Sequence, residues 1–141
     1  VHVYDPNVRQ QYCLIAGGSG LTPCLQLIRT VMNNPNDHTI IKLIYANVTL
    51  EDIWYYKELL KYQESRPDQF QVQFVLEQPP ENWTGSTGYV TAELMQKIFG
   101  DGNSAKHFDG KFKALFCGPP AMNRLVMQNF NTLNYTKDLV H

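Results

Sequence analysis

The segment LIAGGSGLTP, residues 14–23, constrains the fold more than any other part of the sequence. Gly17, Gly18 and Gly20 follow an apolar run directly and come shortly before Pro23. Glycine inside a regular helix or strand costs roughly 0.5–1 kcal/mol relative to alanine, because its backbone loses more entropy on folding. Such a segment is therefore either a turn that needs unusual backbone angles or a place where a ligand contacts bare backbone.

Strands and helices are predicted to alternate along the whole chain. Apolar or β-branched runs predict strands over residues 11–16, 40–46, 71–76 and 112–117. Capping residues and helical spacing of apolar residues predict one helix from Pro23 to Met32 with Thr22 as its cap, a second that starts at Thr49, and two more over 91–99 and 122–133. This alternation, with short connections, indicates parallel βαβ units. We expect a single doubly wound, Rossmann-like α/β domain with a parallel sheet.

The composition excludes several classes of function. The net charge of −1 gives no basic field for nucleic acid or an anionic membrane. No apolar run approaches the ~20 residues that a membrane span needs. The three cysteines, Cys13, Cys24 and Cys117, lack CxxC spacing, and no histidine pair has the spacing of metal ligands. We therefore expect reduced thiols in the cytoplasm and no metal site.

The glycine segment lies where ligands bind in this class of sheet. Ligands sit beyond the carboxyl ends of parallel strands, near the point where the strand order reverses. Bare backbone at Gly17, Gly18 and Gly20 can approach an anion, and the positive end of the following helix points at the same place. The order GGxGxxP departs from the usual GxGxxG fingerprint, so a plain strand-to-helix turn stays open as the alternative on the glycines alone.

Two further segments, YANVTLED and CGPPAMN, follow the second and the last predicted strands and fall on the same edge. With AGGSGLTP, PNDHT and ENWTGSTGYVT they run in order over about residues 11–135. Together they resemble the pyridine-nucleotide domain, the C-terminal half, of the ferredoxin–NADP reductase superfamily. Within that superfamily they are most similar to the branch of cytochrome b5 reductases and eukaryotic nitrate reductases.

The resemblance implies an oxidoreductase that uses NADH, with NADPH the less favoured cofactor. The nicotinamide would give a hydride to FAD, which would then reduce a haem protein such as cytochrome b5 one electron at a time. In this family a preceding β-barrel domain holds the FAD, and no such barrel is found here. The chain would then be one half of a reductase, inactive alone, with residues 1–10 as a remnant of the interdomain connection and residues 11–141 as the nucleotide domain. A membrane anchor, if present, would lie outside this chain. A non-catalytic nucleotide-sensing module and an NADPH-dependent relative remain the alternatives.

Asp52 has two interpretations. In the first, Thr49 and Asp52 form a helix cap, and the acid meets the positive end of the helix. In the second, which the resemblance favours, its carboxylate accepts a hydrogen bond from the adenosine ribose and repels a 2′-phosphate. The end of the preceding strand, at Tyr45, Ala46 and Asn47, would carry further nucleotide contacts or ordinary packing.

Cys117 lies at the end of an apolar strand and has no base partner in the sequence, so it is either a small buried apolar residue or a positioning residue. The resemblance places it beside the nicotinamide, with a positioning role and no covalent chemistry. Gly118 and Pro119 would leave room for the nicotinamide, and Pro120 and Met122 would lie beside it. Thr22 would cap its helix, contact the cofactors, or do both. Trp83 and Tyr89 are expected to pack against the core.

Overall fold

The computed structural model describes residues 10–106, 108 and 110–140. Four parallel strands, β1 (Gln10–Gly17), β2 (Ile40–Asn47), β3 (Phe70–Leu76) and β5 (Lys111–Cys117), form most of one sheet, and the two-residue strand β4 (Ser86–Thr87) completes it. The strand order is β4-β3-β2-β1-β5. The order therefore reverses between β1 and β5, which is where the expected glycine loop leaves the sheet.

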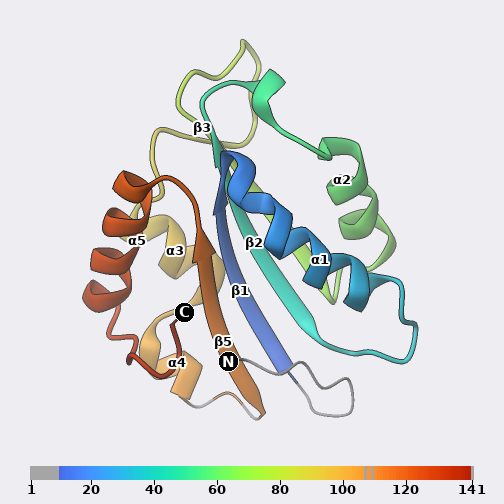
Figure 1. Ribbon diagram of the computed structural model, residues 1–141, viewed down its shortest axis with the longest axis vertical. Helices are drawn as coiled ribbons and strands as arrows, with labels where there is room; N and C mark the ends of the chain where they lie inside the picture. Colours follow the sequence, from blue (N-terminus) through green and yellow to red (C-terminus); the bar gives the residue numbers. More distant parts are fainter. Residues whose placement is uncertain (1–9, 107, 109, 141) are drawn as a thin grey trace.

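Helices cover both faces of the sheet, as Figure 1 shows. The helices α1 (Leu21–Met32) and α2 (Tyr56–Ser65) lie on one face, and α3 (Ala92–Phe99), α4 (Gly102–Lys106) and α5 (Pro120–Thr132) lie on the other. Side chains of β1 alternate between the two layers: Tyr12 and Leu14 pack under α1, whereas Cys13 and Ile15 pack toward α3 and α5. Every residue of β1 is buried, as expected for the central strand of a sheet covered on both faces. The doubly wound α/β fold predicted from the sequence is confirmed.

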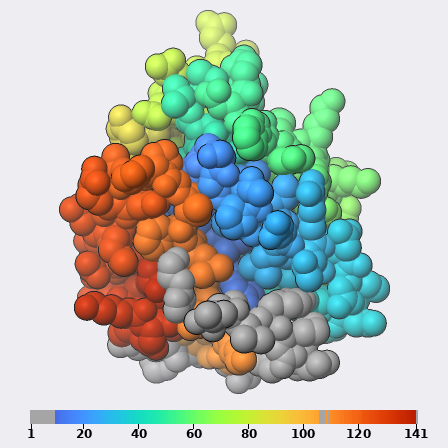
Figure 2. Space-filling model, viewed as in Figure 1, coloured from blue at the N-terminus to red at the C-terminus, as the bar shows by residue number. Residues whose placement is uncertain are grey.

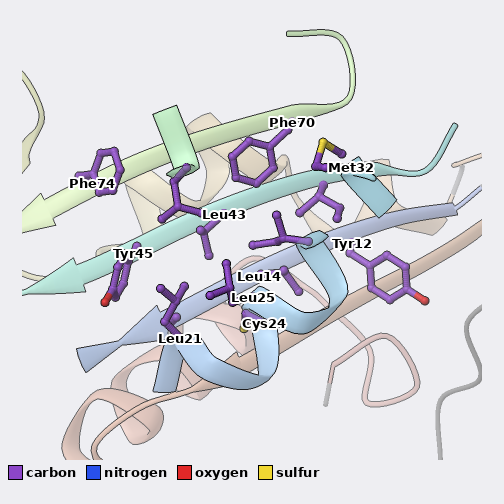
Figure 3. Close-up of a cluster of buried hydrophobic side chains, with 14 of the residues drawn as sticks. Tyr12, Leu14, Leu21, Cys24, Leu25, Met32, Leu43, Tyr45, Phe70 and Phe74 are labelled. Atoms are coloured by element: carbon purple, nitrogen blue, oxygen red, sulfur yellow. The ribbon is translucent and has the colours of Figure 1, made fainter. Parts of the chain in front are cut away.

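Helix α1 packs against the sheet through one apolar face. The predicted apolar positions Leu25, Ile28, Val31 and Met32 are all buried. In Figure 3 the side chains of Leu21, Cys24 and Leu25 point from α1 toward the strands, where Leu14 and Leu43 meet them. This packing fixes the start of α1 close to the end of β1.

The start of α1 corrects the first helix prediction. The helix begins at Leu21 with Gly20 as its N-cap, and no side chain forms a cap hydrogen bond there. Thr22 is therefore the second helical residue and exposed, not the cap. Pro23 is third, which is tolerated because the first turn has no intrahelical partner for its backbone N–H groups.

The second helix is also shorter than predicted. Thr49 caps a 3₁₀ turn, η2 (Leu50–Asp52), and α2 starts only at Tyr56 after Tyr55 takes a left-handed conformation. The last helix starts at Pro120, two residues earlier than predicted. Strand β4 and helix α4 lie in segments that the sequence predicted as loops. Residues 1–9 of the expected interdomain connection lie outside the described part, and Gln10 is the first residue of β1.

Candidate functional site

A cavity of about 720 Å³ lies at the carboxyl edge of the sheet. Its wall is made by the segments that follow β1, β2, β3 and β4 and by the first turns of α5. The residues that line it are Gly17, Gly18, Ser19, Ala46, Asn47, Val48, Asp52, Trp54, Glu77, Gly88, Tyr89, Val90, Pro119, Ala121, Met122 and Leu125. The cavity thus spans the edge from the topological switch point to the far side of β3.

About half of the residues predicted for the site line this cavity. Those that line it are Gly17, Gly18, Ala46, Asn47, Asp52, Pro119 and Met122. Those that lie outside its lining are Gly20, Thr22, Tyr45, Cys117, Gly118 and Pro120. Several of the second group support the first, as the contacts below show.

The glycines of the loop have different structural roles. Gly18 has a φ of +57°, and a Cβ atom there would meet nothing within 4 Å. Gly18 therefore exposes bare backbone to the cavity in a conformation that favours glycine. At Gly20 a Cβ atom would collide with the carbonyl group of Cys117, so this glycine permits α1 to approach the end of β5. In the space-filling view the blue residues that begin α1 meet the orange residues that follow β5 (Figure 2).

The end of β2 brings an amide donor to the cavity. Asn47 is only 8% exposed, and its Nδ2 atom is buried without a hydrogen-bond partner in the part of the chain described here. Burial raises the pKa of the Tyr45 hydroxyl, and the Asn47 side chain is near enough to that hydroxyl to oppose part of this rise. The amide carries two N–H donors, and the Tyr45 hydroxyl is near enough for only one of them, so a ligand acceptor would lower the cost of burying the other. Asn47 thus fits a bound molecule that offers an acceptor.

Tyr45 holds the wall of the cavity together without lining it. Its hydroxyl donates to the carbonyl oxygen of Gly18 over 3.3 Å and accepts a hydrogen bond from the Trp54 backbone N–H over 3.3 Å. The Tyr45 side chain is fully buried, and burial raises its pKa, so the hydroxyl stays protonated at neutral pH. Tyr45 therefore joins the glycine loop to the segment between η2 and α2.

Two carboxylates border the cavity, although the sequence predicted only one. The Oδ2 atom of Asp52 accepts hydrogen bonds from the Thr49 backbone N–H over 3.0 Å and from its hydroxyl over 2.9 Å, so the capping interpretation is confirmed. Glu77 follows β3, and within the described residues its carboxylate has no hydrogen-bond or ion-pair partner. The Glu77 carboxylate is thus free to accept hydrogen bonds from a ligand, whereas Oδ2 of Asp52 is already engaged.

Cys117 lies behind the cavity wall at the end of β5. It pairs with Ala16 of β1 and is half-buried, and all three cysteines are free. Gly118 contacts Met122 so closely that a Cβ atom on Gly118 would collide with the methionine side chain. Met122 in turn lines the cavity, so Cys117 and Gly118 set the position of this part of the wall.

The sequence prediction missed the aromatic residues of the site. Tyr89 was expected in the core, yet it is 67% exposed and lines the cavity, which corrects that expectation. Trp54, 50% exposed, also lines it. Trp83 does pack against the core, as predicted, and its indole N–H donates to the Ser86 carbonyl oxygen over 3.0 Å. Glu77 had a signal in the sequence, since an acid that directly follows a strand of a parallel sheet falls on the ligand edge.

Among the described residues, no three His, Cys, Asp or Glu side chains gather as a metal site would require. Within the same part of the chain, no helix has the length and apolar character needed to cross a bilayer.

A reversal of strand order, a glycine loop at a helix start and a cavity along the carboxyl edge together define a dinucleotide-binding α/β domain. The family model described as "Oxidoreductase NAD-binding domain" matches residues 14–128. The chain belongs to this family of oxidoreductase NAD-binding domains.

Individual relatives narrow the comparison. The chain is 43% identical over 134 residues to "NADH-cytochrome b5 reductase 1" of Meyerozyma guilliermondii, an alignment that covers 95% of this chain and 45% of that protein. It is 38% identical to "NADH--cytochrome b5 reductase 1" of Arabidopsis thaliana over 136 residues, 96% of this chain and 46% of the relative. The solved cytochrome b5 reductase domain of Ulva prolifera nitrate reductase is similar with a TM-score of 0.82 and 28% identity, over 94% of this chain and 48% of that one. The chain thus spans about half the length of the curated relatives it matches.

Proposed function

We propose that this chain binds NADH along the carboxyl edge of its sheet, as the nicotinamide-nucleotide half of a flavin-dependent reductase. One observation carries the proposal: a single cavity joins the glycine loop at the switch point to two carboxylates beyond β2 and β3. Bare backbone at a helix start favours a pyrophosphate, and carboxylates favour the hydroxyl groups of a ribose. A dinucleotide has both groups, one at its centre and one toward its end.

The pyrophosphate would lie on the backbone of Gly17 and Gly18. Gly20 keeps the start of α1 at the end of β5, so the first N–H groups of the helix point toward the same place. Thr22, in that first turn and exposed, is available for a further contact with the cofactor. Asn47 would donate its buried amide to the bound nucleotide, with Ala46 beside it in the wall.

The adenosine ribose would lie between the two carboxylates. Glu77 is the stronger candidate for the ribose hydroxyls because its carboxylate is free, and Asp52 adds a second negative charge. No lysine or arginine is among the residues that line the cavity. A 2′-phosphate would therefore meet repulsion without a compensating cation, which favours NADH over NADPH.

The nicotinamide would lie near Pro119 and Met122. Bound NADH supplies a hydride, which carries two electrons, to the flavin. The residues of this chain would orient the ring: Cys117 and Gly118 from behind the wall, and Pro120 by starting α5 directly after it. None of them is asked to form a covalent bond.

The remaining parts of the proposal concern the whole protein. FAD would be held mainly by a domain outside this chain, and the electron acceptor would be a haem protein such as cytochrome b5. The names of the relatives and the share of their length that this chain spans support this assignment. The free thiols support a cytoplasmic location, with any membrane attachment through segments outside this chain.

Calorimetry of NADH and NADPH binding tests the proposal. We expect the 141-residue chain to bind NADH more tightly than NADPH, and Glu77→Gln to narrow the difference by about tenfold, the effect of one charge at a partly exposed site. Asp52→Asn should narrow it less, because Oδ2 is engaged by Thr49. Equal affinities in the unmodified chain would contradict the assignment. With ferricyanide as acceptor, the chain alone should oxidise no NADH. The full-length protein should oxidise NADH only when its flavin is bound. A full-length protein that binds NADH but no flavin would be a sensing module instead.

A further inference from the structure

We propose that Trp54 supplies the aromatic surface on which the adenine ring of the bound dinucleotide stacks, and that Arg29 holds Trp54 in place through Tyr55. This proposal rests on the NADH binding proposed above and assigns the subsite of its adenine.

Trp54 has the position and exposure that an adenine subsite requires. It lines the cavity two residues after Asp52, so it lies next to the place of the adenosine ribose. Half of its surface is exposed, which is unusual for a large apolar side chain in the wall of a cavity. Tyr89, also exposed, lines the cavity from the segment that leads into α3, whereas Trp54 comes from the segment that leads into α2 on the other face of the sheet (Figure 1). Two aromatic residues therefore border the cavity, from segments that lead to opposite faces of the sheet.

The backbone of Trp54 is tied to the glycine loop. Its N–H donates to the Tyr45 hydroxyl, which in turn donates to the carbonyl oxygen of Gly18, each over 3.3 Å. The buried Tyr45 side chain therefore fixes the distance between the glycine loop, where the pyrophosphate would bind, and the backbone of Trp54. A fixed separation suits a ligand in which the pyrophosphate and the base are covalently linked.

Tyr55 shows that this segment is held in an uncommon conformation. Its φ of 60° and ψ of 30° place it in the left-handed region, which bulky side chains rarely adopt. Such a conformation persists only where the surroundings determine it, and it occurs most often near functional sites. Here it separates η2 from α2 and thereby sets the direction in which Trp54 leaves the chain.

Arg29 of α1 makes a cation–π contact with the Tyr55 ring in this conformation. Its guanidinium carbon lies 5.0 Å from the centre of the Tyr55 ring. The same guanidinium donates two hydrogen bonds to the Glu58 carboxylate, Nε to Oε2 and Nη2 to Oε1, each over 2.8 Å. Tyr62 donates to Oε2 of Glu58 over 2.8 Å as well. The planar guanidinium is thus fixed in orientation and holds the Tyr55 ring against it.

Arg29 does not line the cavity, so it acts as a positioning residue through Tyr55 and Trp54. This arrangement gives two sets of measurable consequences, one for the stacking surface and one for its support.

Calorimetry with ADP, which contains the adenine end alone, and with NADH tests the stacking surface. Trp54→Leu should lower the affinity for both ligands by the same factor, about 5-fold to 100-fold, as expected for the loss of one base–aromatic contact. Trp54→Phe should retain most of the affinity because it keeps a ring. The control is Met127→Ala, which removes a similarly exposed apolar side chain from α5 outside the cavity. In a Trp83→Phe background, ADP should quench the fluorescence of Trp54.

Three results separate the possible failures. If Trp54→Leu binds ADP and NADH as the unmodified chain does, the stacking proposal is wrong and NADH binding stands. A loss for NADH but not for ADP would place Trp54 away from the adenine and overturn the proposal equally. If the unmodified chain binds neither ligand, the proposed function fails first.

A double-mutant cycle tests the support. Arg29→Gln should lower the affinity for ADP by about threefold to tenfold, the effect of one lost cation–π contact and one lost ion pair. Arg29→Lys should recover part of the loss, since it keeps the charge above the Tyr55 ring. In the Trp54→Leu background, Arg29→Gln should cause no further loss, because Arg29 acts only through the indole. Equal losses in both backgrounds would refute the positioning role, and Lys57→Gln on α2 serves as the matched control.

Discussion

Replacement of Gly20 by alanine tests how closely α1 must approach the end of β5. The new Cβ atom would collide with the carbonyl carbon and oxygen of Cys117 and lie 3.1 Å from the backbone nitrogen of Gly118. All three atoms belong to backbone, and β5 is held by its pairing with β1, so no flexible side chain can move away. The helix itself must move outward.

The size of the effect follows from two opposing contributions. Overpacking in a rigid region costs typically about 1–3 kcal/mol, and a backbone contact lies at the upper end of that range. Gly20 has a φ of −64° and a ψ of −6°, which alanine adopts without strain, so the substitution also gains about 0.4–1 kcal/mol from the unfolded state. The net loss in the free energy of unfolding should be about 2 kcal/mol, which lowers Tm by about 4–8 °C for a chain of this size.

Gly18→Ala provides the comparison, because it fails for a different reason. A Cβ atom at Gly18 meets no neighbour, and only the positive φ of +57° is unfavourable. Asparagine tolerates this conformation better than alanine does, so the Tm of Gly18→Asn should be at least as high as that of Gly18→Ala. At Gly20 the larger side chain only adds to the collision, so the Tm of Gly20→Asn should be lower than that of Gly20→Ala. Differential scanning calorimetry of the four variants measures these differences. A Gly20→Ala variant with an unchanged Tm would refute the close approach of α1 to β5.

Two further predictions concern the cysteines and an ion pair. Burial raises the pKa of Cys13 and Cys24 to about 12, so these thiols stay protonated at neutral pH. Iodoacetamide should therefore modify the half-buried Cys117 first, as followed by mass spectrometry. Modification of Cys24 ahead of Cys117 would contradict this order. Hydrogen bonds from Arg29 lower the pKa of Glu58 below its ordinary value of 4.5. The stabilisation is therefore present above that value and lost as the pH falls through the lowered pKa. Glu58→Gln should cost about 0.5–1 kcal/mol at neutral pH in urea denaturation, since both groups are partly exposed, and the difference from the unmodified chain should vanish in acid.

The main strands and the sheet could be predicted because their signal is local. Residues 12–16 of β1 are an uninterrupted apolar run that ends at glycines, and β2 is apolar except for Lys42 and Asn47, so the local pattern identified both. Strand β4 has two residues and α4 has five, which are too short for any periodicity to develop. The start of α5 does have a local signal, since Pro120 occupies the first helical position, where proline is favoured.

The error at the start of the second helix falls at a residue that contacts the preceding helix. A cap at Thr49 followed by apolar residues is a sound reason to start a helix, and a short 3₁₀ turn does start there. The chain then leaves the helix at Tyr55, which has a left-handed conformation and whose ring centre lies 5.0 Å from the guanidinium carbon of Arg29 in the preceding helix. No pattern within residues 49–60 contains that information. Trp54 lies in the same break between η2 and α2, so the missed helix boundary and the missed site residue fall in one segment.

The register of the parallel strands explains why residues so far apart in sequence share one cavity. Gly17 pairs with Ala46, Asn47 pairs with Leu76, and Ala16 pairs with Cys117, so four strands end within one or two residues of a common line. The burial of β1 on both faces fixes this register, since a slip of one residue would exchange the side chains of the two layers. That line brings the glycine loop, Glu77 and the start of α5 to one edge of the sheet, and close contacts between the glycine loop and the segment after β5 join two of them. The packing of β1 between β2 and β5 therefore determines the length of the cavity, and the loops that follow the strands determine which ligand chemistry it presents.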